Sequence, residues 1–151
     1  MPHYTIEKLE LCDYAKCSNI WNMATFPLTE QFREEIADGN RIVFIYKIDG
    51  EFIGEIAYVI ENGDPDYTIP GQRVYISRLI VKEEYRNRGI GGVLVDHILQ
   101  TVRALGYVEA SIGVDKDNLP ALHLYRKKGF STVLFDGEDE AGPYYKLLKK
   151  L

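Results

Sequence analysis

Apolar and polar residues alternate over residues 4–11, which predicts a strand, and apolar residues then recur at helical spacing over residues 13–23. Thr29 is expected to cap a second helix, which should end before Gly39. The chain is therefore predicted to open with one strand followed by two helices.

Two runs of β-branched and aromatic residues follow, "RIVFIYKI" at 41–48 and "EFIGEIAYVIE" at 51–61. They are joined by Asp49 and Gly50, a pair that suits the positive backbone angles of a tight two-residue turn. This pattern predicts an antiparallel hairpin.

Glycine, proline and aspartate are concentrated in "NGDPDYTIPG" at 62–71, which is typical of an exposed loop. The next run, "RVYISRLIVK" at 73–82, predicts a central strand. From Ile90, apolar residues recur at helical spacing as far as Leu105, and Gly106 is expected to end that helix.

The C-terminal part is predicted to contain a strand at 107–114, a helix over 117–129 that tolerates Pro120 in its first turn, and closing strands at 130–135 and 144–151. This order mixes hairpins with helical crossovers. It predicts an α/β fold, in which a mixed sheet has helices on both faces and forms a single domain over residues 1–151.

The composition narrows the function classes. With 46% hydrophobic and 27% charged residues among 151, the chain resembles a globular protein, and no apolar run approaches the ~20 residues of a membrane-spanning helix. Its formal charge of -5 lacks the basic excess that neutralises nucleic-acid phosphates, so neither a membrane nor a nucleic-acid partner is expected. The initial "YTIEKLEL" is not preceded by the basic and apolar segments of a secretory signal, and a cytoplasmic location is expected.

Metal-ligating residue types are few. Cys12 and Cys17 lie about 140° apart around a helix, which suits neither a local disulfide nor paired metal ligands. His3, His97 and His123 are scattered along the chain. No metal site is predicted.

The stretch "EYRNRGIGGVLVDHI" at 84–98 places three glycines where the helix after the central strand should begin. A first helical turn has unpaired N–H groups and the positive end of the helix dipole, so it attracts anions. Gly89, Gly91 and Gly92 would expose those amides and allow positive backbone angles, and Arg86 and Arg88 would add positive charge. The alternative is a tight strand-to-helix turn in which the glycines serve close packing.

Two common phosphate-binding patterns do not fit this turn. The order G-x-x-x-x-G-K-[ST] is absent. Arg86 and Arg88 also occupy positions where G-x-G-x-x-G needs its early glycines. A pyrophosphate bound by another fold is implied.

These residues resemble the GNAT superfamily of acetyl-coenzyme A-dependent N-acetyltransferases. The family signature [RQ]-x-x-G-x-[GA] is matched by "RNRGIG" at 86–91, and a second family feature is matched by "NLPALHLYRKKGF" at 118–130. The order of predicted elements agrees from about residue 4 to 149. The resemblance implies a mostly antiparallel, twisted GNAT-like sheet and acetyl-CoA as the acyl donor.

The resemblance also implies roles for individual positions. The central strand would hydrogen-bond the pantetheine arm through its backbone, with the Leu79 N–H facing the thioester oxygen, and Tyr125 would protonate the leaving sulfur. The implied cofactor-binding residues are Leu79, Ile80, Val81, Arg86, Asn87, Arg88, Gly89, Ile90, Gly91, Gly92, Asn118 and Tyr125. Asn118 and Tyr125 are two helical turns apart and so share a face. The alternative is a capping asparagine and a core tyrosine.

The general base is less evident. Many family members carry an acid near the start of the central strand, where this chain has Tyr75 and Ser77. Glu55 is the candidate base, because an unpaired buried carboxylate in the run "FIGEIAYVI" would be unfavourable. Alternatively, Glu55 pairs with Arg78 or faces water, and a water molecule or an already neutral amine makes a protein base unnecessary.

The acceptor is expected to be the primary amine of a small molecule that attacks acetyl-CoA directly in a ternary complex, since the sequence shows no second recognition domain. Acidic stretches at 61–66 and 136–140 suit a cationic amine, whereas Arg73 and Arg78 suit an acceptor with a carboxylate. The candidate substrate-binding residues are Tyr75, Ser77 and Arg78.

Other hypotheses stay open at this point. They are acetylation of a protein or peptide amine, a coenzyme-binding sensor without turnover, and an interaction protein without a coenzyme site. The C-terminal strands, with Tyr144 and Tyr145, are a candidate homodimer interface.

Overall fold

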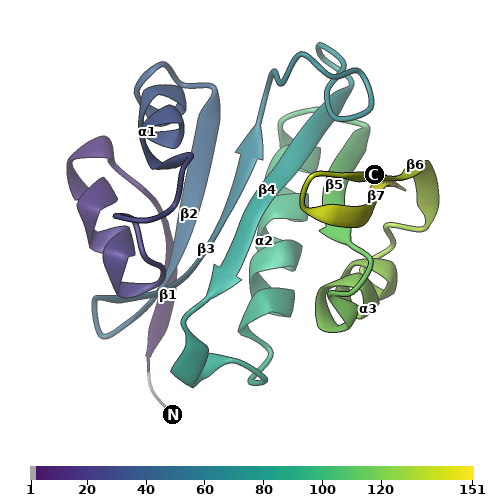
Figure 1. Ribbon diagram of the computed structural model, residues 1–151. Coiled ribbons are helices and arrows are strands. Elements are labelled where there is room, and N and C mark those ends of the chain that lie inside the picture. The colour runs from purple at the N-terminus through teal and green to yellow at the C-terminus, as the bar shows by residue number, and fades with distance from the viewer. Residues whose placement is uncertain (1–2) are drawn as a thin grey trace. The chain divides into compact units, whose positions relative to one another are not determined.

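The computed structural model describes residues 3–151; Met1 and Pro2, the start of the predicted single domain, lie outside the described residues (Figure 1). The chain divides into two compact units. Unit 1 comprises Met1–Tyr58 and Arg78–Ile98, and unit 2 comprises Val59–Ser77 and Leu99–Leu151. Each unit is described by itself below.

The predicted order of strands and helices is confirmed, with one additional short helix. The elements are β1 (Tyr4–Lys8), η1 (Leu11–Asn19), α1 (Thr29–Ala37), β2 (Arg41–Ile48), β3 (Glu51–Val59), β4 (Arg73–Val81), η2 (Glu83–Tyr85), α2 (Ile90–Ala104), β5 (Glu109–Asp115), α3 (Leu119–Lys127), β6 (Thr132–Asp139) and β7 (Gly142–Lys150). The sheet has seven strands in the order β1-β2-β3-β4-β5-β7-β6. Because only β4 and β5 are parallel among the registers described, the sheet is mixed and mostly antiparallel.

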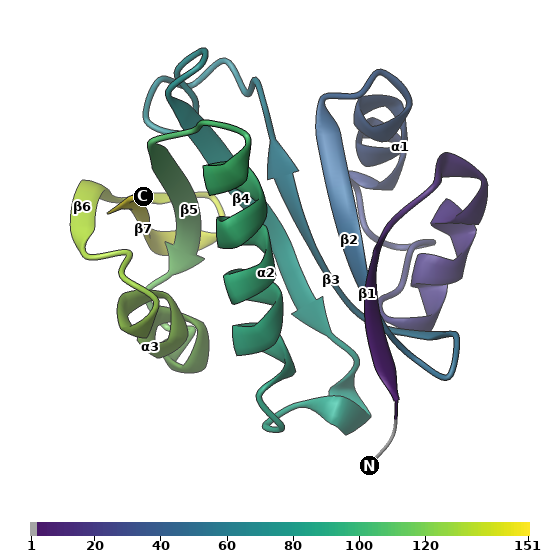
Figure 2. The same cartoon turned by 180° about the vertical axis from the view of Figure 1, so that it is seen from behind.

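Helices cover both faces of the strands in unit 1. On one face, η1 and α1 pack against β2 and β3 through a core that includes Trp21, Phe32 and Val43 (Figure 1). On the other face lies α2 (Figure 2). Its His97 contacts Phe44 of β2, with ring centroids 4.7 Å apart. The alternation of Val43 and Phe44 between the two faces is the two-residue period of a strand.

The hairpin between β2 and β3 is confirmed at its turn. Asp49 has φ 50° and Gly50 has φ 80°. Two successive left-handed residues define the turn that matches the twist of paired strands.

Two local predictions in unit 1 were wrong: the type of the first helix and the capping role of Thr29. The segment predicted as an ordinary helix over 13–23 is the 3-10 helix η1, and its buried Tyr14 and Cys17 are three residues apart, as a three-residue turn requires. Thr29 is not the cap of α1 but its first residue, and its hydroxyl donates to the carbonyls of Met23 and Phe26.

Unit 2 is built around β5. β5 pairs antiparallel with β7 along its whole length and parallel with β4 over Arg73 to Ile76, and α3 lies beside it (Figure 2). The acidic stretch 136–140, which lies outside the predicted strands, contributes the end of β6, where Asp136 pairs with Tyr145 of β7. Cross-strand pairing outweighs the low strand propensity of Asp and Gly there.

No helix among residues 3–151 combines the length and the hydropathy needed to cross a membrane.

Candidate active site

The glycine turn of unit 1 has two left-handed residues, Asn87 with φ 63° and Gly89 with φ 83°. The Gly89 carbonyl accepts the Val93 N–H at 3.2 Å, so it begins the hydrogen-bond ladder of α2. Gly91 and Gly92 already lie inside the helix, and the positive angles expected there are found instead at Asn87 and Gly89.

The space beside Gly89 is open. A Cβ placed on Gly89 would meet no heavy atom within 4 Å. Packing therefore does not demand glycine at this position, whereas the left-handed backbone favours it. An open, left-handed turn before a helix N-terminus fits an anionic diphosphate.

Both arginines of the turn are exposed and held by neighbours. Arg86 Nε donates to the Val81 carbonyl at 3.0 Å, which ties the turn to the end of β4. The Arg88 guanidinium lies 5.1 Å from the centre of the Tyr85 ring. These contacts hold the two guanidinium groups beside the glycine turn.

A left-handed residue also interrupts β4. The parallel register with β5 covers Arg73 to Ile76, and Arg78, two residues later, has φ 60°. Such a conformation is uncommon for a residue with a side chain and is sparsely populated within strands. Leu79, Ile80 and Val81, the predicted pantetheine-binding residues, follow directly after it.

Arg78 and Glu55 belong to a buried cluster in unit 1. The Arg78 guanidinium lies 4.4 Å from the centre of the Trp21 ring and 4.0 Å from that of Phe26. Trp21 Nε1 donates a hydrogen bond to Glu55, which is only 3% exposed. Burial raises the pKa of the Glu55 carboxyl, while the hydrogen bond from Trp21 and the charge of Arg78 act in the opposite direction.

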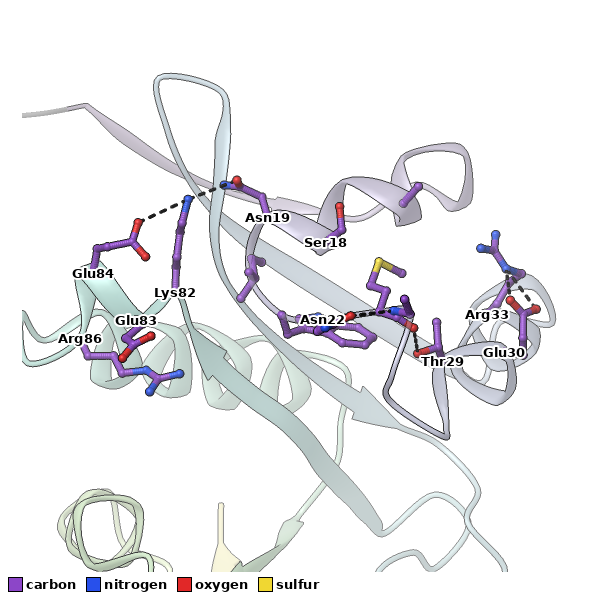
Figure 3. Close-up of a pocket in the computed structure, with 15 residues that line it drawn as sticks. Ser18, Asn19, Asn22, Thr29, Glu30, Arg33, Lys82, Glu83, Glu84 and Arg86 are labelled. Carbon is purple, nitrogen blue, oxygen red and sulfur yellow. Dashed lines mark hydrogen bonds and ion pairs between the residues drawn. The ribbon is translucent and has the colours of Figure 1, made fainter.

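A cavity of about 790 Å³ lies within unit 1 (Figure 3). Lys82, Glu84 and Arg86 lie at one end of it, and Glu30 and Arg33 lie at the other. Lys82 donates to Asn19 at 3.2 Å and lies 3.6 Å from Glu84, and Arg33 lies 3.4 Å from Glu30. The acidic and basic side chains of its lining are therefore largely paired with one another.

A second cavity, of about 440 Å³, lies within unit 2. The structure brings three predicted site residues together there: Tyr75 from β4, and Asn118 and Tyr125 from α3. The Asn118 side-chain oxygen accepts the Ala121 N–H at 3.3 Å, so Asn118 is the cap of α3, as one alternative had it. Its amide nitrogen is not used by this cap.

Tyr125 is 6% exposed and lies edge-on to Phe130, with ring centroids 6.2 Å apart. Burial, with a smaller effect of Tyr75, raises the pKa of Tyr125 to about 12. The hydroxyl therefore carries its proton at neutral pH. Among the hydrogen bonds of residues 3–151, none involves this hydroxyl.

Ser77, the remaining candidate for substrate binding, is buried in β4 and lines neither cavity. Sequence reasoning missed Trp21, Tyr67 and Asp115, whose importance depends on contacts across distant segments. Among these three, only Tyr67 had a local signal in the sequence. The isolated glycine in the strand "EASIGVD" is typical of a close approach by another group, and Tyr67 does approach Gly113.

Among the described residues, no group of three or more histidine, cysteine, aspartate or glutamate side chains is arranged to hold a metal ion. Cys12 is exposed and Cys17 is buried, and both are free thiols.

The chain is similar to proteins of known activity. An N-alpha-acetyltransferase of Sulfurisphaera tokodaii is 30% identical over 118 residues, which are 72% of this chain and 71% of that protein. The streptothricin acetyltransferase of Streptomyces lavendulae is 33% identical over 101 residues, which are 62% of this chain and 52% of that protein.

Similarity of fold extends further. The solved structure of the PaiA N-acetyltransferase from Thermoplasma acidophilum, in complex with coenzyme A, has a TM-score of 0.70, with 17% identity and 99% of each chain covered. The family model described as "Acetyltransferase (GNAT) family" matches residues 4–130, a range that includes the turn before α2 as well as Asn118 and Tyr125. The chain belongs to this GNAT family and is an acetyl-CoA-dependent N-acetyltransferase.

Proposed function

We propose that this enzyme transfers the acetyl group of acetyl-CoA to the primary amine of a small molecule, by direct attack in a ternary complex. The observation that carries the proposal is Tyr125: the residue is only 6% exposed, and its protonated hydroxyl, which has no hydrogen-bond partner among residues 3–151, lines a cavity of about 440 Å³. Cavities of this size suit small ligands.

The acyl donor would be held mainly by backbone groups. The N–H groups of residues 87–92 would bind its diphosphate, with help from Arg86 and Arg88, because the turn is open and left-handed at Gly89. The backbone of Leu79, Ile80 and Val81 would pair with the pantetheine arm as an added strand does. Asn118 would offer its free amide nitrogen to that arm.

In the reaction, the amine nitrogen attacks the thioester carbon, a C–N bond forms, and the C–S bond breaks. The Leu79 N–H would donate to the oxygen that becomes negatively charged. Tyr125 would give its proton to the departing thiolate, and its raised pKa means that the phenol is protonated at neutral pH. The nitrogen loses one proton.

Two routes for that last proton follow from the sequence, transfer to Glu55 or transfer to water. Glu55 accepts a hydrogen bond from Trp21, is 3% exposed and lines neither cavity. This burial supports loss of the proton to water, or attack by an amine that is already neutral.

Acetylation of a peptide α-amine is a second candidate function, because the Sulfurisphaera tokodaii relative is an N-alpha-acetyltransferase. Release of free thiol from acetyl-CoA can be followed with a panel of small amines and of short peptides. Turnover with small amines at a kcat/KM at least ten times that for peptides is the expected result. Preference for the peptides would favour the second candidate. Coenzyme binding without any amine-dependent thiol release would instead indicate a coenzyme-binding sensor without turnover.

The role of Tyr125 is tested in the same assay. Tyr125→Phe keeps the ring that packs on Phe130 and should lower kcat by about 100-fold, the usual contribution of a positioned acid, with an unchanged Tm. An unchanged kcat would remove Tyr125 from the mechanism.

A further inference from the structure

The charged side chains that line the cavity of unit 2 are all negative. Its lining includes the carboxylates Asp115 and Asp139, no lysine and no arginine. The cavity of unit 1, in contrast, has three acidic and three basic side chains, namely Glu30, Glu83, Glu84, Arg33, Lys82 and Arg86. A cavity lined by one sign of charge concentrates ligands of the opposite charge.

The carboxylate of Asp115 is available to a ligand. No hydrogen bond or ion pair between residues 3–151 involves its side chain. Asp139 uses one oxygen to accept the Ala141 N–H at 2.9 Å, which leaves its other oxygen for a ligand. Of the other acids that suggested a cationic acceptor, Asp64 and Asp66 bind Lys146, and Asp136 binds Lys116. Glu61, Glu138 and Glu140 do not line the cavity.

Tyrosine side chains make up much of the remaining wall. Tyr67, Tyr75, Tyr125 and Tyr144 line the cavity, and the rings of Tyr67 and Tyr75 lie 4.3 Å apart. Ring faces attract ammonium ions, and phenolic oxygens accept their hydrogen bonds. Tyr125, a residue only 6% exposed, adds to this wall a hydroxyl without a hydrogen-bond partner among residues 3–151.

The tyrosine wall is fixed in place. The Tyr67 carbonyl accepts the Ser111 hydroxyl at 2.6 Å, and Lys146 holds the loop through Asp64 at 2.7 Å. A Cβ at Gly113 would lie 2.7 Å from the Tyr67 hydroxyl, so glycine at residue 113 leaves room for this hydroxyl. An arrangement that needs such precise neighbours is preorganised for a ligand.

The same unit argues against an acceptor with a carboxylate. Arg73, the one of the two candidates for binding that group that belongs to this unit, lies 3.3 Å from Glu109 and donates to the carbonyls of Pro65 and Asp66 at 3.1 Å each. Its guanidinium is therefore occupied within unit 2.

We propose that the cavity of unit 2 binds the cationic end of the acceptor, so that the preferred substrates are amines with a second positively charged group, such as α,ω-diamines. The inference rests on the proposed function and narrows it to a substrate class. Asp115 and Asp139 determine this specificity by pairing with the second ammonium group, and the tyrosine rings enclose it.

Three acceptors of equal length test the idea: 1,5-diaminopentane, pentylamine and 5-aminopentanoate. The wild type should acetylate the diamine with a kcat/KM about fivefold above that of pentylamine, and the aminocarboxylate should be the poorest substrate. Asp115→Asn and Asp139→Asn should each bring the diamine towards pentylamine through KM, with kcat unchanged. The side-chain oxygen of the asparagine in Asp139→Asn can still accept the Ala141 N–H, so the turn should be retained.

Asp117→Asn is the matched control. It removes the same charge two residues from Asp115, on an exposed side chain that does not line the cavity, and should leave the preference as it is. A diamine preference that is absent, or that survives both cavity variants, overturns the inference.

A measurement of acceptor binding without acetyl-CoA tests the cationic cavity independently of the proposed acetyl transfer. Thermal shifts of the wild type and of Asp115→Asn are measured with each of the three compounds, without acetyl-CoA. A shift for the diamine alone that Asp115→Asn abolishes supports the cationic cavity even if no compound is acetylated, an outcome that would overturn only the proposed function. Equal shifts for all three compounds would overturn the cavity assignment whatever the turnover.

Discussion

The indole Nε1 of Trp21 donates a hydrogen bond to the carboxylate of Glu55, and both side chains are buried in unit 1. The bond joins the segment after η1 to the middle of β3. Burial, with a smaller effect of the nearby Glu55 carboxylate, raises the pKa of the Cys17 thiol. One carboxylate thus organises polar groups inside an apolar core.

Replacement of Glu55 by glutamine should stabilise the protein at neutral pH. The folded-state pKa of Glu55 lies above the ordinary value of 4.5, so its contribution to stability is complete below that pH and is lost as the pH rises through the folded pKa. Glutamine does not titrate and can still accept the Trp21 N–H. The free energies of unfolding in urea should agree near pH 4 and diverge as the pH rises to 7, in favour of the variant.

The same Glu55→Gln variant tests the route of the proton. If the amine loses its proton to water, kcat should change by less than about threefold, because no base has been removed. A fall of about 100-fold in a variant that is at least as stable as the wild type would instead identify Glu55 as the base.

Gly89→Ala should weaken coenzyme A binding more than it weakens the fold. The left-handed backbone at φ 83° costs an alanine roughly 1 kcal/mol, and its methyl group would occupy the open space proposed for the diphosphate. We expect the Kd for coenzyme A, measured by calorimetry, to rise about tenfold.

Gly106→Ala is the matched control for Gly89→Ala. Gly106 has φ 98° and likewise has no heavy atom within 4 Å of an added Cβ, but it follows the other end of α2. It should lower the free energy of unfolding by a similar amount and leave the Kd unchanged. Equal effects of the two variants on the Kd would argue against a diphosphate at Gly89.

Several features were predictable because they depend on neighbouring residues. The turn at Asp49 and Gly50 was predicted, as were the strand over 73–82 and the glycine that follows α2, since turn residues and short-range periodicity carry this information. The 3-10 geometry of η1 was missed, because periods of 3.0 and 3.6 residues differ little over nine residues.

The candidate site was only partly predictable. The glycine turn, Asn118 and Tyr125 lie in contiguous motifs that resemble a known family. Glu55 was noticed as a carboxylate in an apolar strand, but its partner Trp21 lies 34 residues away and nothing local indicates it. Asp115 lines the cavity of unit 2 together with Tyr67 and Tyr75, which come from distant segments of the chain.

Gly113→Ala should disturb the cavity of unit 2 through Tyr67. The added Cβ would lie 2.7 Å from the Tyr67 hydroxyl but 3.6 Å from the ring carbon that carries it. We expect the free energy of unfolding to fall by ~1–3 kcal/mol, as for overpacked sites. The double variant Tyr67→Phe, Gly113→Ala should recover most of that loss, because it removes only the clashing oxygen, and urea unfolding of the four proteins in the cycle measures this coupling. Additive losses would contradict the contact.

Tyr125 should make the fold sensitive to high pH. Burial raises its pKa from the ordinary value of 10 to about 12, so its stabilising contribution is present below pH 10 and is lost as the pH rises towards 12. Relative to Tyr125→Phe, the wild type should lose ~1 kcal/mol per pH unit in that window. Urea unfolding of both proteins at successive alkaline pH values checks this, and parallel curves would contradict the assigned shift.

Lys146 reaches two carboxylates of the loop that carries Tyr67, at 2.7 Å from Asp64 and 3.2 Å from Asp66. The pKa of Asp64 is lowered, chiefly by its hydrogen bond with Lys146, and the pKa of Lys146 is raised by both acids against the opposing effect of burial. Neither partner therefore changes charge in the neutral range, and the loop stays fastened under cellular conditions. If the rate of acetyl transfer varies with pH in the neutral range, the variation consequently reports the ionisation of the acceptor or of the reacting groups. It does not report an opening of the loop that carries Tyr67.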